Sequence, residues 1–228
     1  MGVRRTDVEP HIREALKLRQ RLMPYWYTLA WQACRDGAPI VRPLFWVDPE
    51  DEALREIEDA FMLGEHLLVA PVLESGRTVR EVQLPRGRWF DLYGDGEYEG
   101  PGRLTLFAPL ERCPVLVRAG SVLPVENEGK LTLEIFAPQT DSGTGLLYSD
   151  AGDGYGPHRL DRFMLNRERD TLEISWEKEG GFPFPYDTIQ LSVHGFAITS
   201  ANVDGETVEL EAHTIQVSPF DCVRMESK

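Results

Sequence analysis

The stretch Leu67-Leu68-Val69-Ala70-Pro71-Val72-Leu73 separates two parts of the sequence that differ in character. It is a continuous apolar run, typical of a strand buried on both faces in a parallel sheet or a central sheet position. After Glu74 the helix signals stop. Short alternating runs such as Leu131–Phe136 and Thr171–Trp176 follow, separated by Gly, Pro, Asp and Asn. Many short strands at this spacing indicate β-sandwiches.

Upstream of that stretch the pattern is helical. Apolar residues recur at spacings of three and four between residues 8 and 35, which predicts an amphipathic helix. Pro24 should kink this helix or split it in two, and Gly37 suits a left-handed C-cap at its end. The aromatic cluster Tyr25, Trp26, Tyr27 and Trp31 is too dense for an isolated helix, so we expect a partner to cover it.

The strand-rich part contains two local signals. The polar segment Glu126-Asn127-Glu128-Gly129 predicts a boundary between two groups of strands. The segment Val203–Val208 predicts a hairpin that turns at Asp204-Gly205.

Length and charge exclude several classes of protein. The chain has 228 residues, whereas a complete (β/α)8 barrel needs about 250. With 38 acidic and 24 basic residues, the formal net charge is −14. Phosphate backbones and anionic lipids repel such a chain, so we expect neither nucleic-acid nor membrane binding. Cys34, Cys113 and Cys222 are far apart and odd in number, and no signal peptide is evident, so we expect a reducing, cytoplasmic location.

Six segments carry a family resemblance and occur in one order along the chain: Leu18–Tyr27, Gly37–Phe45, Asp59–Val72, Leu84–Asp91, Pro109–Pro124 and Leu147–Tyr155. Together they resemble the C-terminal part of glycoside hydrolase family 31, the α-glucosidase and α-xylosidase family. The last segment, Leu-Tyr-Ser-Asp-Ala-Gly-Asp-Gly-Tyr, is the most divergent of the six. The resemblance fades after residue 156.

The resemblance implies an architecture. The fold class is mostly β, with two consecutive β-sandwich domains preceded by the helical and last-strand end of a (β/α)8 barrel. Residues 1–73 are expected to be the barrel remnant, 74–125 the proximal sandwich and 126–228 the distal sandwich.

The resemblance also implies a function that this chain does not perform alone. Family members are retaining hydrolases in which one aspartate attacks the sugar and a second protonates the leaving oxygen. Both lie on barrel strands upstream of Leu18, so no catalytic residue is assigned here and whether the chain is itself an enzyme stays open. The expected partner is the rest of the barrel, through which an α-glycoside would bind. The alternatives are a stand-alone carbohydrate-binding or interaction module and one subunit of a split glycosidase.

Eight residues of the matching segments are assigned structural roles by the resemblance: Arg42, Pro43, Asp59, Gly64, Pro71, Trp89, Arg118 and Gly120. The guanidinium of Arg42 is expected to pair with a buried carboxylate or with carbonyls, and Asp59 and Asp91 are the candidate carboxylates.

Other candidate sites are weak. Asp150 and Asp153 lie in a Gly-rich turn and could supply oxygen ligands to a metal, but turn chemistry is the favoured interpretation. Trp46, Trp89 and Trp176 could stack on sugars, but core packing is the favoured interpretation. No cofactor is expected.

Overall fold

A computed structural model describes residues 5–139, 142–152, 155–211 and 214–227. The chain is mostly β and forms two compact units. The first unit comprises Met1–Arg21 and Pro39–Arg118, and the second comprises Leu22–Ala38 and Ala119–Lys228. Among the described residues, none of the helices combines the length and apolar character needed to cross a bilayer.

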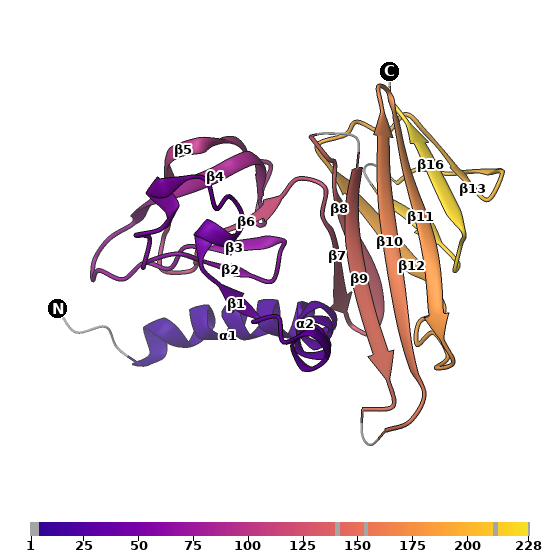
Figure 1. Ribbon diagram of the computed structural model, residues 1–228, viewed down its shortest axis with the longest axis horizontal. Helices are drawn as coiled ribbons and strands as arrows, with labels where there is room; N and C mark the ends of the chain where they lie inside the picture. Colours follow the sequence, from indigo (N-terminus) through magenta and orange to yellow (C-terminus); the bar gives the residue numbers. More distant parts are fainter. Residues whose placement is uncertain (1–4, 140–141, 153–154, 212–213, 228) are drawn as a thin grey trace. The chain divides into compact units, whose positions relative to one another are not determined.

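The first unit contains helix α1 and one six-stranded sheet (Figure 1). Helix α1 is Arg5–Arg21, and two 3₁₀ turns are η1 (Leu44–Trp46) and η2 (Glu52–Leu54). The strands are β1 (Val41–Arg42), β2 (Phe61–Leu63), β3 (Leu67–Val69), β4 (Val79–Asp91), β5 (Glu97–Phe107) and β6 (Val115–Arg118). They run in the order β1-β2-β3-β6-β4-β5, and every pair is antiparallel.

Strand β3 corrects one prediction from the sequence. Residues 67–73 are not the last strand of a barrel, because β3 pairs antiparallel with β2 on one side and with β6 on the other. A (β/α)8 barrel strand has parallel neighbours. The central, buried position predicted from the apolar run is confirmed for its first part, since Leu67 and Leu68 are fully buried, but the strand ends at Val69 and Leu73 is 69% exposed.

The second unit contains helix α2 and two sheets that enclose one apolar core (Figure 1). Helix α2 is Met23–Asp36. The six-stranded sheet has the order β14-β13-β16-β11-β10-β9, and the four-stranded sheet has the order β15-β12-β8-β7. The strands are β7 (Val122–Asn127), β8 (Lys130–Phe136), β9 (Ser142–Asp150), β10 (His158–Glu168), β11 (Thr171–Gly180), β12 (Ile189–His194), β13 (Ser200–Val203), β14 (Glu206–Val208), β15 (Thr214–Val217) and β16 (Cys222–Glu226).

The predicted helix break is confirmed. Helix α1 ends at Arg21, and α2 begins at Met23 with Pro24 in its first turn, where the missing N–H removes no helical hydrogen bond. Gly37 closes α2 in the left-handed conformation, with φ at 71°, and its N–H donates to the Ala33 carbonyl.

The turn signals mark hairpins. The hairpin at Asp204-Gly205 joins β13 to β14 as predicted. Residues 126–129 are also part of a hairpin, because Asn127 pairs with Lys130 across β7 and β8. The division between the compact units therefore lies after Arg118 rather than near residue 125, since β7 pairs within the second unit.

Candidate functional site

Helix α2 is fastened to strand β9 by a cluster that we call the Asp150 anchor: Tyr27, Thr28, Trp31, Tyr148 and Asp150. Tyr27 and Trp31 lie four residues apart and so share one face of the helix. Tyr148 and Asp150 lie two residues apart and so share one face of the strand. The Thr28 hydroxyl donates to the Pro24 carbonyl at 2.8 Å and accepts from the Tyr148 N–H at 3.0 Å.

The Asp150 carboxylate is the polar centre of this anchor. Its Oδ1 accepts from the Tyr27 hydroxyl at 2.7 Å and from the Gly152 N–H at 2.8 Å. Its Oδ2 accepts from the Tyr148 hydroxyl at 2.9 Å. Both oxygens are therefore engaged, and the bond from Tyr27 to Asp150 joins two residues that are 123 positions apart in the sequence.

Ring stacking adds to these hydrogen bonds. The rings of Trp31 and Tyr148 stack with centroids 5.2 Å apart and an interplanar angle of 16°. His158 stacks on Tyr148 at 5.9 Å, and the Arg35 guanidinium lies 5.0 Å from the centroid of Trp31. Tyr148 thus provides a partner on β9 for Tyr27 and Trp31, two of the four residues in the aromatic cluster that the sequence indicated would need one.

The hydrogen bonds also shift the acidities of the anchor. Burial alone would raise the pKa of Asp150, but hydrogen bonds from Tyr27, Gly152 and Tyr148, helped by nearby His158, outweigh burial and lower this pKa. The hydrogen bond to Asp150, followed by burial, raises the pKa of Tyr27. Burial, followed by the hydrogen bond to Asp150, raises the pKa of Tyr148 to about 12. Asp150 is therefore held ionised, with its two tyrosines protonated as donors.

This geometry suits a structural role for Asp150 rather than a nucleophilic or metal-binding one. Its lone pairs are directed at donors of the protein itself. The second metal candidate, Asp153, lies outside the described residues. Among the residues that are described, no group of three or more His, Cys, Asp or Glu side chains is placed to hold a metal ion.

Arg42 pairs with a carboxylate and a carbonyl, but its partners differ from those suggested by the sequence, and the carboxylate is 64% exposed rather than buried. Its Nη1 lies 3.0 Å from Glu65 Oε1, and its Nε donates to the Pro39 carbonyl at 2.9 Å. Asp59 and Asp91 are instead paired with Arg80 and Arg112. Glu65 is the nearer acid because the tight β2–β3 turn brings it beside β1.

Arg80 links two of the assigned structural residues. Its Nη2 lies 2.7 Å from Asp59 Oδ2, and its Nε donates to the Pro71 carbonyl at 3.1 Å. The Arg80 side chain is only 14% exposed, although it lies in the alternating strand β4. Sequence reasoning missed it because nothing in the spacing of residues 59, 71 and 80 indicates a shared partner.

The other assigned residues occupy turns, strand ends and the core. Pro43 precedes η1, and Gly64 makes the β2–β3 turn with φ at 61°. Arg118 ends β6, and its N–H donates to the His66 carbonyl at 2.9 Å. Gly120 has φ at 82° and donates to the Phe136 carbonyl at 2.8 Å.

The tryptophans considered for sugar stacking differ in exposure. Trp89 is fully buried and its indole N–H donates to the Pro85 carbonyl at 3.0 Å. Trp176 is 5% exposed, so it belongs to the core of the second unit. Trp46 is 50% exposed and retains a solvent-facing ring.

Trp176 is held by a cluster of charged side chains that was not predicted from the sequence. Asp161 is fully buried, accepts from the Trp176 indole N–H at 2.7 Å and pairs with Arg159 Nε at 2.9 Å. The Arg159 guanidinium lies 5.8 Å from the Trp176 centroid, and the Lys178 ammonium lies 4.5 Å from it. The sequence signal that could have indicated this cluster is the position of Asp161 two and four residues before Phe163 and Leu165, which places it on the inward face of the alternating strand β10.

Comparison with known proteins identifies the family. Residues 37–123 match the glycosyl hydrolase family 31 C-terminal domain. The chain is 34% identical over 190 residues to neutral alpha-glucosidase AB of Homo sapiens, an alignment that covers 76% of this chain and 20% of that protein. The chain thus spans about a fifth of that relative's length.

Solved structures agree on the fold. The GH31 dextranase of Flavobacterium johnsoniae, complexed with glucose, aligns with a TM-score of 0.87 at 24% identity, covering 99% of this chain and 33% of that one. The GH31 alpha-xylosidase of Xanthomonas citri aligns with a TM-score of 0.72 at 28% identity, covering 92% of this chain and 24% of that one. The chain belongs to glycosyl hydrolase family 31 and corresponds to the C-terminal part of the proteins of that family.

Proposed function

We propose that this chain is the non-catalytic C-terminal part of a retaining α-glycosidase, and that it completes and braces a catalytic barrel supplied by other residues. The observation that carries this proposal is the Asp150 anchor. It fixes α2, which begins in the first matching segment, to β9, which ends in the last matching segment. A helix held in this way can transmit the rigidity of a sandwich to a neighbouring domain.

In this proposal α1 and α2 are the helical end of the barrel. Ile12 and Leu16, four residues apart on α1, are 55% and 57% exposed, and Met23 at the start of α2 is 41% exposed. Apolar side chains on one face of a helix favour a covering partner. We infer that the remaining barrel provides that cover, whether it is encoded in the same chain or in a separate one.

The catalytic carboxylates are assigned to the barrel rather than to this chain. A retaining pair needs two carboxyl groups about 5–5.5 Å apart and free to reach a sugar. The acidic candidates in this chain are engaged in structural contacts, since Asp59 pairs with Arg80 and Asp150 accepts three hydrogen bonds. The substrate would be an α-glycoside bound by the barrel. The cytoplasmic location is part of the proposal and draws on three free thiols.

Co-expression of this chain with a family 31 barrel segment that ends before Leu18 tests the assembly. We expect the two polypeptides to co-purify. Ile12→Glu with Leu16→Glu should abolish co-purification, whereas Glu9→Lys with Arg13→Glu, which reverses an exposed ion pair on α1, should preserve it. Separate elution of the unmodified partners would contradict the bracing role.

A further inference from the structure

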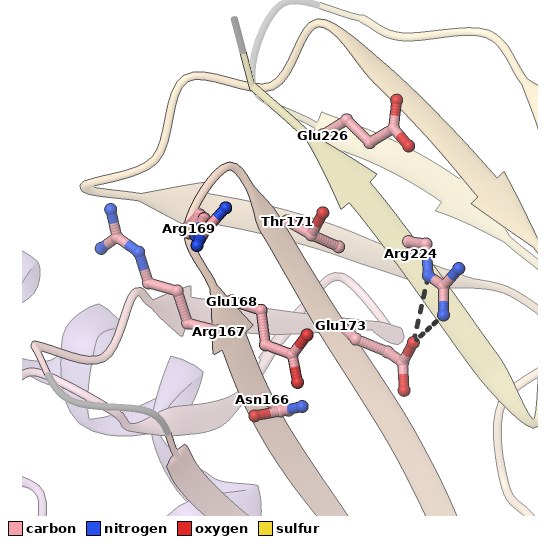
Figure 2. A pocket seen from close by; sticks show the side chains of 8 residues that line it. All are labelled: Asn166, Arg167, Glu168, Arg169, Thr171, Glu173, Arg224 and Glu226. Carbon is pink, nitrogen blue, oxygen red and sulfur yellow. Dashed lines mark hydrogen bonds and ion pairs between the residues drawn. The ribbon is translucent and has the colours of Figure 1, made fainter.

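An open groove of about 810 Å³ lies on the second unit, where β10, β11 and β16 meet (Figure 2). We call it the β10–β16 groove. Its lining is made almost entirely of polar and charged side chains. The residues used below are Asn166, Glu168, Arg169, Glu173, Arg224 and Glu226. It lies at the opposite end of the β9–β10 pair from the Asp150 anchor, since Asn166 pairs with Ser142 whereas Asp150 pairs with His158, and it takes no part in the bracing role proposed above.

The groove side chains are placed in register by the sheet. Asn166 lies opposite Glu173, Glu173 opposite Arg224, and Arg224 opposite Asn202 on β13. Four adjacent strands therefore present an amide, a carboxylate, a guanidinium and a second amide in one line. Neighbouring strands are about 4.8 Å apart, so hydrogen-bonding groups recur at that spacing across the sheet.

The central pair is fixed in orientation. Arg224 donates to Glu173 Oε2 from Nε at 3.2 Å and from Nη2 at 2.8 Å, the two contacts drawn in Figure 2. A guanidinium has five donor hydrogens, and these two bonds use only part of that set. The carboxylate likewise has a second oxygen, so the pair can both donate to a ligand and accept from it.

The charges of the groove do not favour an ionic ligand. Arg169 and Arg224 alternate with Glu168, Glu173 and Glu226, so a charged ligand of either sign meets like charge along the groove. The third arginine of the lining, Arg167, donates to the Pro138 carbonyl. A neutral polyol has no such penalty, because each of its hydroxyl groups donates one hydrogen bond and accepts others.

We propose that the β10–β16 groove binds a short α-linked glucose oligosaccharide at a site separate from the catalytic pocket. The mixed charges and hydrogen-bonding groups of the groove favour a neutral, polyhydroxylated ligand, and the choice of an α-glucan among such ligands rests on the proposed function. Such a site would hold a polymeric substrate near the barrel and leave the chemistry unchanged.

Calorimetric titration of the full chain with maltotetraose and isomaltotetraose tests this site. We expect saturable binding of at least one of them, unaffected by high salt because the ligand is neutral. Arg224→Ala should weaken binding about tenfold, which is the size expected for losing a hydrogen bond from a charged group. Asn166→Ala should weaken it less.

Arg162→Ala is the matched control. Arg162 lies on β10 of the same sheet, is paired with Glu179 at 3.5 Å and is outside the groove, so its loss should leave binding unchanged. Circular dichroism of each variant separates lost binding from lost folding. Absence of saturable binding by the folded chain, or equal weakening by Arg162→Ala, would overturn the groove proposal. Neither result touches the bracing role, which co-purification tests separately.

Discussion

Removing the acceptor of the Asp150 anchor should loosen helix α2 selectively. Asp150→Ala deletes three hydrogen bonds, from Tyr27, Tyr148 and Gly152. Hydrogen bonds to charged groups contribute about 1.5–3 kcal/mol each. Tyr27 is 40% exposed, so water replaces part of that contribution. We therefore expect a loss of about 1 kcal/mol for each bond, or about 2–3 kcal/mol in total.

Native-state hydrogen exchange of the α2 amides measures this loss where it acts. Tyr27→Phe should accelerate exchange about fivefold, which corresponds to about 1 kcal/mol. Asp150→Ala should accelerate it considerably more. The amides of α1 belong to the other compact unit and serve as the internal reference. Tyr155→Phe, at a fully exposed tyrosine beyond the same strand, should change nothing.

The double variant gives the decisive comparison. If Tyr27 acts through Asp150, the two losses should fall short of additivity by about 1 kcal/mol. The folded pKa of Asp150 is lowered, so its stabilisation is present above the unfolded pKa of about 3.9 and is lost as the pH falls through the folded pKa. Asp150→Ala should not show this loss of stability at low pH. Additive effects, or α2 exchange unchanged in Asp150→Ala, would refute the anchor.

Three further outcomes are expected. Asp161→Ala removes the acceptor of buried Trp176 and of partly buried Arg159, so it should lower the free energy of unfolding by about 3–5 kcal/mol in urea titrations. Asp221→Ala, at a surface pair, should lower it by less than about 1 kcal/mol. Gly120→Ala should destabilise more than Gly129→Ala in thermal melts. Both have positive φ, costing about 1–2 kcal/mol, but only at Gly120 does an added Cβ meet a backbone oxygen, at 3.2 Å. The pKa of Tyr148 is raised to about 12, so its contribution to the free energy of unfolding is present below the unfolded pKa near 10 and is lost as the pH rises through the folded pKa. An ultraviolet titration should show the ionisation of Tyr148 at this high pH, and Tyr148→Phe should remove it.

Local features of the fold could be predicted from the sequence because local chemistry determines them. Pro24 cannot donate within a helix, so the break before it followed from one residue. The hairpin at Asp204-Gly205 followed in the same way, since both residues tolerate positive φ. The buried, central position of Leu67–Val69 could be predicted from its apolar run.

Strand direction and distant partners could not be predicted. An apolar run has the same pattern in parallel and antiparallel sheets, so β3 was mistaken for a barrel strand. The pairing of Tyr27 with Asp150 and the link from Arg80 to Asp59 depend on how the chain folds back on itself. The partner of Arg42 was misjudged because Glu65 becomes its neighbour only through the β1–β2–β3 pairing.

The most direct test of whether catalysis lies outside this chain is the turnover of an aryl α-glucoside and an aryl α-xyloside. Turnover is measured for the purified chain alone and after its assembly with a family 31 barrel segment that carries the catalytic aspartates. We expect no turnover by the chain alone and measurable turnover by the assembly, greater than that of the barrel segment by itself. Robust turnover by the chain alone would contradict the assignment of catalysis to residues outside it.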